Sequence, residues 1–131
     1  MVIKIVVATM VFLSCLPKAW ATPPISVTIT YDLNRQVLHI DAPHPSDKLD
    51  KHYLRKVQIY LNGKEAATVF YPRQKLPSGL AEDISFAAEA GDNISVELTC
   101  SQGGIGKASL DISKPPEELK ASQNDQKNLK K

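Results

Sequence analysis

The residues best suited to do chemistry in this chain are three histidines and one cysteine. His39, His44 and His52 fall within fourteen positions, and they are the only histidines of the 131 residues. Cys100 lies much further along the chain. Imidazole nitrogen and thiolate sulfur are ligands that bind iron, zinc and copper. The pattern indicates a transition-metal site. The alternative is three surface histidines and a buried thiol that behaves as a small apolar side chain.

The first 21 residues predict an export signal. Lys4 precedes an apolar run over residues 5–16, and Ala19-Trp20-Ala21 has the small-x-small pattern of a cleavage site. The run is shorter than the roughly 20 apolar residues that a membrane span needs. We therefore expect cleavage before Thr22, a periplasmic or secreted product and no membrane span in the mature chain. The alternative is an uncleaved N-terminal anchor.

Cleavage would change both the thiol content and the charge of the protein. Cys15 leaves with the signal, so Cys100 would be alone in a compartment where disulfides persist. Such a thiol is buried, paired with another chain or bound to a ligand. Lys4 and Lys18 also leave, and no acid precedes Thr22, so the formal net charge of +2 falls to zero. A neutral domain without a basic cluster is not expected to bind nucleic acid.

Alternating apolar and polar residues predict that the rest of the chain is almost entirely β. Residues 25–31 alternate without a break, and residues 36–41 can return as their hairpin partner. A strand over residues 57–61 ends at Asn62-Gly63, which favours a two-residue type I′ turn. Further strands are predicted over residues 66–71, 84–86, 93–100 and 107–112. About seven short strands and no helical period predict an antiparallel β-sandwich domain over residues 22–113.

These elements would hold the candidate ligands at strand ends. Within the predicted strand 93–100, Cys100 shares one face with the apolar residues, so its sulfur should lie at the rim of the core. His44 lies in the polar, proline-containing loop 43–50, and His52 opens the strand that follows. Loops of this kind carry functional sites more often than strands do.

The strand that follows His52 contains a break in its alternation. Leu54 has the parity of His52, whereas Val57 and the apolar residues after it have the opposite parity. If both Leu54 and Val57 are buried, a bulge or kink must lie between them, and bulges redirect side chains near sites.

The last segment differs in composition from the domain. Residues 114–131 are rich in lysine, asparagine and glutamine and poor in apolar residues. Such a segment cannot bury enough apolar surface to offset the entropy of ordering, which predicts a disordered polar tail.

Two segments of the chain are similar to a known family. Ala42-Pro43-His44-Pro45, followed by the strand that begins with His52-Tyr53-Leu54, resembles the iron-binding domain of the desulfoferrodoxin and superoxide reductase family. Cys100 and the Ser101-Gln102-Gly103-Gly104 that follows resemble the Cys-Asn-x-His-Gly segment of the same family. The likeness covers roughly residues 25–112 and implies an immunoglobulin-like β-sandwich. It also implies a ferrous iron centre with four histidine nitrogens and one cysteine thiolate.

The family pattern is matched only in part. His44, His52 and Cys100 fall on two of the histidine ligands and on the thiolate, whereas Gly103 replaces a third histidine. The upstream Glu-Lys-His segment of the family has no counterpart, since the mature chain would begin with Thr22-Pro23-Pro24. His39 stands where the family has no ligand. Three of the five ligands remain, so the complete iron centre cannot be built from this chain.

The sequence therefore leaves two functional hypotheses. The first is an exported desulfoferrodoxin-like domain that binds iron, or else zinc or copper, through His44, His52 and Cys100. Superoxide or a redox donor protein would be its partner, and superoxide reduction or other redox chemistry its activity. The second is a metal-free binding or carrier module, by analogy with the fold of sulfur-oxidation carrier subunits. No hydrolase, phosphate-loop or HExxH motif points to another chemistry or cofactor.

Overall fold

The computed structural model describes residues 21–113, which hold seven β-strands and no helix. No helix able to cross a membrane is therefore found among them. The predicted signal peptide, apart from Ala21, and the predicted tail 114–131 lie outside the described residues. The strands are β1 (Thr28–Asp32), β2 (Val37–Pro43), β3 (Leu54–Leu61), β4 (Lys64–Phe70), β5 (Gly79–Ser85), β6 (Asn93–Cys100) and β7 (Ile105–Asp111).

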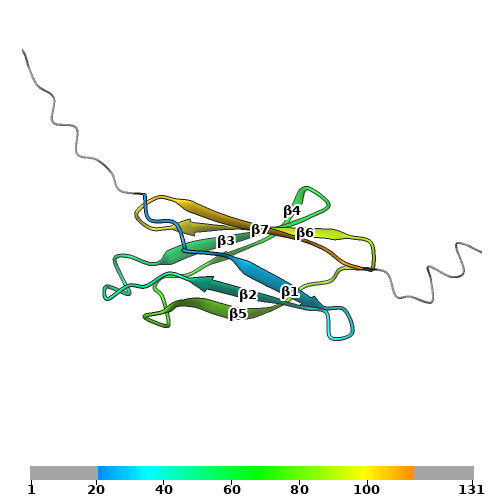
Figure 1. Ribbon diagram of the computed structural model, residues 1–131, viewed down its shortest axis with the longest axis horizontal. Coiled ribbons are helices and arrows are strands. Elements are labelled where there is room, and N and C mark those ends of the chain that lie inside the picture. Colours follow the sequence, from blue (N-terminus) through cyan, green and yellow to red (C-terminus); the bar gives the residue numbers. More distant parts are fainter. Residues whose placement is uncertain (1–20, 114–131) are drawn as a thin grey trace, which may run out of the picture.

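The strands form two antiparallel sheets that lie one over the other (Figure 1). One sheet has the order β1-β2-β5, and the other has the order β4-β3-β6-β7. The predicted turn at Asn62-Gly63 joins β3 to β4, and both residues have positive φ, 51° and 81°. The all-β, two-layer prediction is confirmed.

The core lies between the two sheets and follows the predicted alternation. In β6 every second side chain is buried, from Ile94 to Cys100. Facing them from the other sheet are the buried side chains of β2. The largest fully buried side chains of the core are Leu38, Ile40, Leu54, Val57, Ile59, Ile94, Val96, Leu98 and Cys100. Cys100 is thus the last buried position of its strand, which puts its sulfur at one end of the core.

The structure also contains the predicted bulge. The pairing of β3 with β6 shifts register between Leu54 and Lys56, and both Leu54 and Val57 are buried. The extra residue lets two apolar side chains of opposite parity reach the same core. It also aligns Leu54 with Cys100 across the sheet.

Several predicted strand boundaries were wrong, three of them by enough to matter for the site or the sheet. The first strand begins at Thr28 rather than at residue 25, and Ile25 is 74% exposed. β5 begins at Gly79, well before the predicted 84–86, because its first residues pair with the end of β2. His52 does not open a strand, since it lies in the turn that precedes β3.

Candidate metal centre

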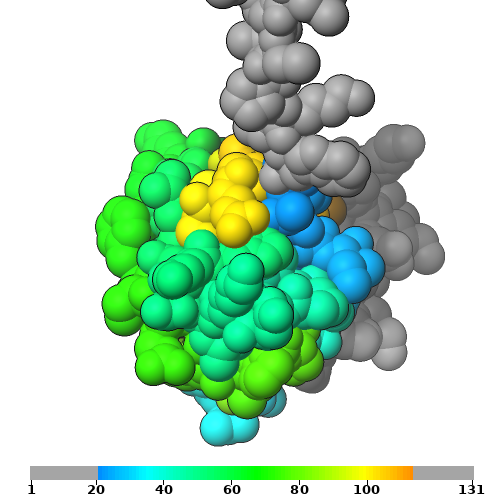
Figure 2. Space-filling view, turned by 90° about the vertical axis from the view of Figure 1, so that its left-hand side faces the viewer, coloured from blue at the N-terminus to red at the C-terminus, as the bar shows by residue number. Residues whose placement is uncertain are grey.

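Three loops meet at one end of the sandwich. They are the N-terminal segment 21–27, the connection from β2 to β3 (44–53) and the connection from β6 to β7 (101–104). Figure 2 shows this end, with the N-terminal segment in blue, the β2–β3 connection in blue-green and the β6–β7 connection in yellow. Thr22 lies in the first of these segments, His44 and His52 lie in the second, and Cys100 directly precedes the third.

The two predicted histidine ligands and the thiol lie together at this end. The candidate ligand atoms of His44, His52 and Cys100 are all within 4.8 Å of one another. The imidazole rings of His44 and His52 make an edge contact, with centroids 4.7 Å apart and planes inclined by 73°. His44 is 3% exposed and Cys100 is 1% exposed, whereas His52 is half-buried. The cluster is therefore enclosed on the core side and open at His52.

The third histidine lies elsewhere. His39 is in the middle of β2, and its Nδ1 pairs with the carboxylate of Asp83 on the neighbouring strand β5. This pair is exposed. His39 is therefore not part of the cluster.

The two ligand-bearing loops are joined by Ser101. Its Oγ donates to the carbonyl of Lys51 over 3.0 Å and accepts from the backbone N–H of Tyr53 over 3.1 Å. Its own N–H donates to the Tyr53 carbonyl over 2.8 Å. Lys51 and Tyr53 flank His52 in the chain, and Ser101 directly follows Cys100. The bonds hold the imidazole beside the thiol.

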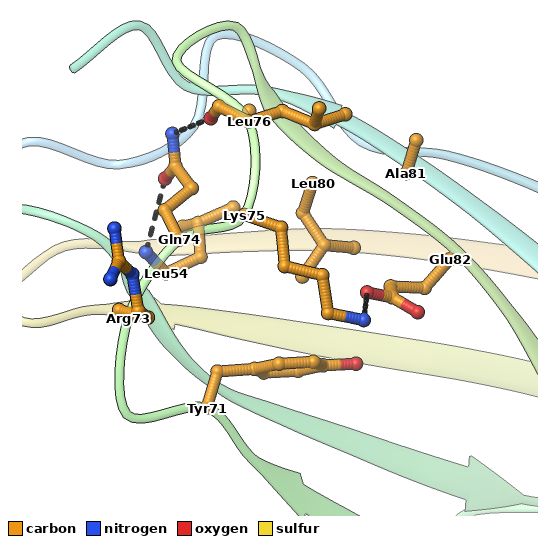
Figure 3. A pocket seen from close by; sticks show the side chains of 10 residues that line it. Leu54, Tyr71, Arg73, Gln74, Lys75, Leu76, Leu80, Ala81 and Glu82 are labelled. Carbon is orange, nitrogen blue, oxygen red and sulfur yellow. Dashed lines mark hydrogen bonds and ion pairs between the residues drawn. The ribbon is translucent and has the colours of Figure 1, made fainter. Parts of the chain in front are cut away.

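Gln74 orients the His44 ring from the loop between β4 and β5. Its Nε2 donates to the carbonyls of His44 and Leu76, over 2.9 and 2.8 Å. With the amide nitrogen placed by two acceptors, Oε1 must face the backbone N–H of Leu54 and Nδ1 of His44, at 3.4 and 3.0 Å. Figure 3 shows the Leu76 and Leu54 bonds of Gln74. The proton of neutral His44 therefore belongs on Nδ1, and Nε2 carries the lone pair.

That lone pair faces a second acceptor. Nε2 of His44 lies 3.2 Å from the backbone carbonyl oxygen of Thr22. Two acceptors this close repel each other unless a proton or a cation interacts with both of them. The arrangement therefore suits a cation at this point.

The side chain of Thr22 occupies the centre of the cluster. Its hydroxyl Oγ1 is 2.8 Å from Nε2 of His52 and 3.3 Å from Sγ of Cys100. Thr22 thus contacts all three candidate ligands, two through the hydroxyl and one through the carbonyl. Sequence reasoning singled out Thr22 only as the predicted mature N-terminus, and it missed Gln74 entirely.

Burial of His52 favours a neutral imidazole. Its pKa lies below the ordinary 6.5 because burial disfavours the charged ring and because His44 lies beside it, while the carboxylate of Asp47 acts in the opposite direction. A neutral imidazole is the form that binds metals.

The candidate ligand atoms would have to move closer together to bind one ion. In the tetrahedral geometry of zinc, bonds of about 2.0–2.1 Å to nitrogen and about 2.3 Å to sulfur place two ligand atoms roughly 3.3–3.6 Å apart. The separation of up to 4.8 Å seen here would have to shorten by about 1 Å through rotation of the side chains. The hydroxyl of Thr22 contacts both His52 and Cys100, so it would have to move aside or bind the ion as well.

Comparison with known proteins finds no family model that matches the chain, no similar curated protein and no similar solved structure. Functional inference therefore depends on the geometry of the cluster and on the motifs in the sequence.

Proposed function

We propose that this protein binds a transition-metal ion through Nε2 of His44, a ring nitrogen of His52 and Sγ of Cys100. The observation that carries the proposal is the lone pair of His44. Gln74 holds the proton on Nδ1 and leaves Nε2 directed at the Thr22 carbonyl, a position that suits a cation. Metal-bound histidines in proteins almost always have their second nitrogen held in this way.

The three side chains have different roles in this proposal. His44 is buried and rigidly oriented, so it defines the inner position of the ion. Cys100 is buried at the end of β6 and supplies a thiolate, the softest of the three ligands. Its sulfur also accepts a long contact, 3.5 Å, from the backbone N–H of Gln102. His52 lies at the open side, where a small molecule can approach.

We further infer from the motif resemblance that the ion is iron and that the fold is immunoglobulin-like. Ferrous iron would supply one electron, which with two protons converts superoxide to hydrogen peroxide. The chain would contribute a buried thiolate and two oriented imidazoles, and it would leave positions open for substrate. Export to the periplasm, with a redox protein as electron donor, is part of the same proposal.

Metal binding is tested with protein isolated from the exported fraction and titrated with Fe²⁺ without oxygen, and with Zn²⁺ and Co²⁺. We expect one equivalent of metal per chain and, with Co²⁺, a thiolate-to-metal absorption band. Cys100→Ala should lose this band, and His44→Ala or His52→Ala should weaken binding. His39→Ala is the matched control, since His39 pairs with Asp83 away from the cluster. It should bind as the wild type does.

The same measurement decides against the proposal if the pure protein takes up no metal, or if Cys100→Ala and His39→Ala bind equally well. A metal-free carrier module would then be the better hypothesis. Consumption of superoxide by the iron-loaded protein, compared with the Cys100→Ala variant, tests the redox activity separately.

A further inference from the structure

The N-terminal segment is packed firmly against the candidate metal centre. The backbone N–H of Thr22 donates to the carbonyl of Gly103 over 3.1 Å, and that of Ile25 donates to the carbonyl of Pro43 over 2.8 Å. One bond attaches the segment to the loop after Cys100, and the other attaches it next to His44. Thr22 is thereby held between the two loops that carry the thiol and the buried histidine.

Two glycines, Gly104 of the β6–β7 loop and Gly106 of β7, lie where the N-terminal segment approaches. A Cβ at Gly104, whose φ is +93°, would lie 2.6 Å from the backbone nitrogen of Pro23 and 3.0 Å from the carbonyl carbon of Thr22. A Cβ at Gly106 would lie 2.3 Å from Cγ of Pro24. Only glycine allows this approach without displacing the segment. The close packing of the N-terminal segment on these glycines therefore fixes the position of Thr22.

We propose that cleavage before Thr22 creates a ligand, the free α-amine of Thr22, which completes the metal centre. This inference rests on the proposed function, because it adds a fourth ligand to His44, His52 and Cys100. It also rests on the predicted signal cleavage. The ligand class is a divalent transition-metal ion that accepts nitrogen and sulfur donors.

Chemistry favours the amine over the peptide nitrogen that it would replace. A peptide nitrogen has no available lone pair, whereas an amine has one and is a strong ligand for such ions. The α-nitrogen is three bonds from the Thr22 carbonyl oxygen and three bonds from Oγ1. These are the two atoms that contact the candidate ligands, at 2.8–3.3 Å. An ion bound by the amine and either oxygen would close a five-membered chelate ring. Both ligand atoms belong to one residue, so closing this ring costs little conformational entropy.

The existing hydrogen bond need not break when the amine binds. An amine carries two hydrogens besides its lone pair, so one N–H can still donate to the Gly103 carbonyl. In the precursor the single N–H of Thr22 makes that bond. Removal of the signal would thus convert an amide that only positions Thr22 into an amine that also binds metal. Metal loading would be coupled to maturation.

The test compares two chains, 22–131 and 21–131. Each is cleaved from an N-terminal fusion partner so that it begins with its natural first residue, Thr22 or Ala21. Both retain all seven strands, since β1 begins at Thr28. The longer chain adds Ala21, which converts the α-amine of Thr22 into a peptide nitrogen and moves the free amine to Ala21. Affinity is measured for Zn²⁺ by competition with a chelator. Because residues that merely support a metal ligand contribute about 10–100-fold to affinity, we expect chain 22–131 to bind at least about 10-fold more tightly.

A spectroscopic readout identifies the ligand atom. Both chains are labelled with ¹⁵N-threonine and loaded with ¹¹³Cd²⁺. The ¹¹³Cd resonance of chain 22–131 should be split by one directly bonded ¹⁵N, and that of chain 21–131 should not. Thr22→Ser in chain 22–131 keeps the amine and the hydroxyl, so it should bind as tightly as the unmodified chain and confirm that the effect belongs to the terminus.

The outcomes separate this inference from the proposed function. If both chains bind Zn²⁺ equally, require Cys100 and show no ¹⁵N splitting, the three-residue site stands and the amine is not a ligand. If neither chain binds metal, both proposals fail. An intact mass showing that the exported protein begins at a residue other than Thr22 would also overturn the inference, since the amine would then lie elsewhere.

Discussion

Oε1 of Gln74 lies 3.0 Å from Nδ1 of His44, and this contact determines which nitrogen of His44 can act as a ligand. The amide orientation of Gln74 is set by two backbone carbonyls, those of His44 itself and of Leu76. Gln74 therefore orients His44 at the inner side of the candidate metal centre without being one of the candidate ligands.

The first prediction concerns Gln74. In Gln74→Ala the His44 ring loses its acceptor, and two buried carbonyls and the N–H of Leu54 lose a partner. We expect metal affinity to fall by about 10–100-fold and the free energy of unfolding of the metal-free protein to fall by about 1–3 kcal/mol. Metal titration and urea denaturation measure the two effects. Gln58→Ala, on the side of β3 away from the core, is the control.

A second prediction is that metal stabilises the fold. An ion that binds only the folded state raises the free energy of unfolding by about 2.7 kcal/mol when its free concentration is 100 times the dissociation constant. We expect the melting temperature to rise with added Zn²⁺ and to return to its original value with a chelator. Cys100→Ala should show no rise, and a rise of equal size in that variant would argue against thiolate ligation.

A third prediction concerns pH. The pKa of His52 is lowered in the folded protein by burial and by the neighbouring His44. The unfolded chain therefore takes up a proton on this ring more readily than the folded chain does. Stability from this source is present above the ordinary pKa of 6.5 and is lost as the pH falls below it.

Two measurements check this pH dependence. NMR titration of the metal-free protein should place the His52 pKa below that of histidine in a short peptide. In His52→Gln, the decline of unfolding free energy between neutral pH and pH 5 should be shallower than in the wild type. Metal affinity should also fall in acid, because the imidazoles and the thiol must be deprotonated to bind. A His52 pKa at or above the peptide value would contradict the prediction.

A fourth prediction compares two glycines with positive φ. A Cβ at Gly79 would lie 2.3 Å from the carbonyl oxygen of Ala42 and 2.6 Å from the backbone nitrogen of His44, at a φ of +146°. At Gly63, with φ of +81°, a Cβ meets nothing within 4 Å. Gly63→Ala should therefore show backbone strain alone, about 1 kcal/mol of lost stability, at the low end of the range for such positions.

Gly79→Ala adds a clash with two backbone atoms, so it should lose clearly more stability, about 3 kcal/mol or more. Because the clash is with the backbone of His44, metal affinity should fall as well, whereas Gly63→Ala should bind metal normally. Equal stability losses in the two variants, measured by urea denaturation, would show that the close approach of β5 to His44 is absent.

Much of the fold follows from local patterns in the sequence. The strict alternation over residues 93–100 predicted β6 to the residue, because an unbroken period of two has one burial pattern. The change of parity between Leu54 and Val57 predicted the bulge, since two apolar residues of opposite parity reach one core only if a residue is inserted. Asn62-Gly63 predicted its turn through the φ angles that these residues tolerate.

The three candidate ligands could also be named from sequence, because histidine and cysteine are rare and their motifs are recognisable. Their arrangement was decided by tertiary structure. Gln74 lies thirty residues from His44 in a loop without periodic pattern, and nothing local distinguishes it from other polar loop residues. Thr22 reaches the cluster because Gly104 and Gly106 let the N-terminal segment approach. Hydrogen bonds between distant loops depend on how two sheets bring strand ends together, and that relationship exists only once the chain is folded.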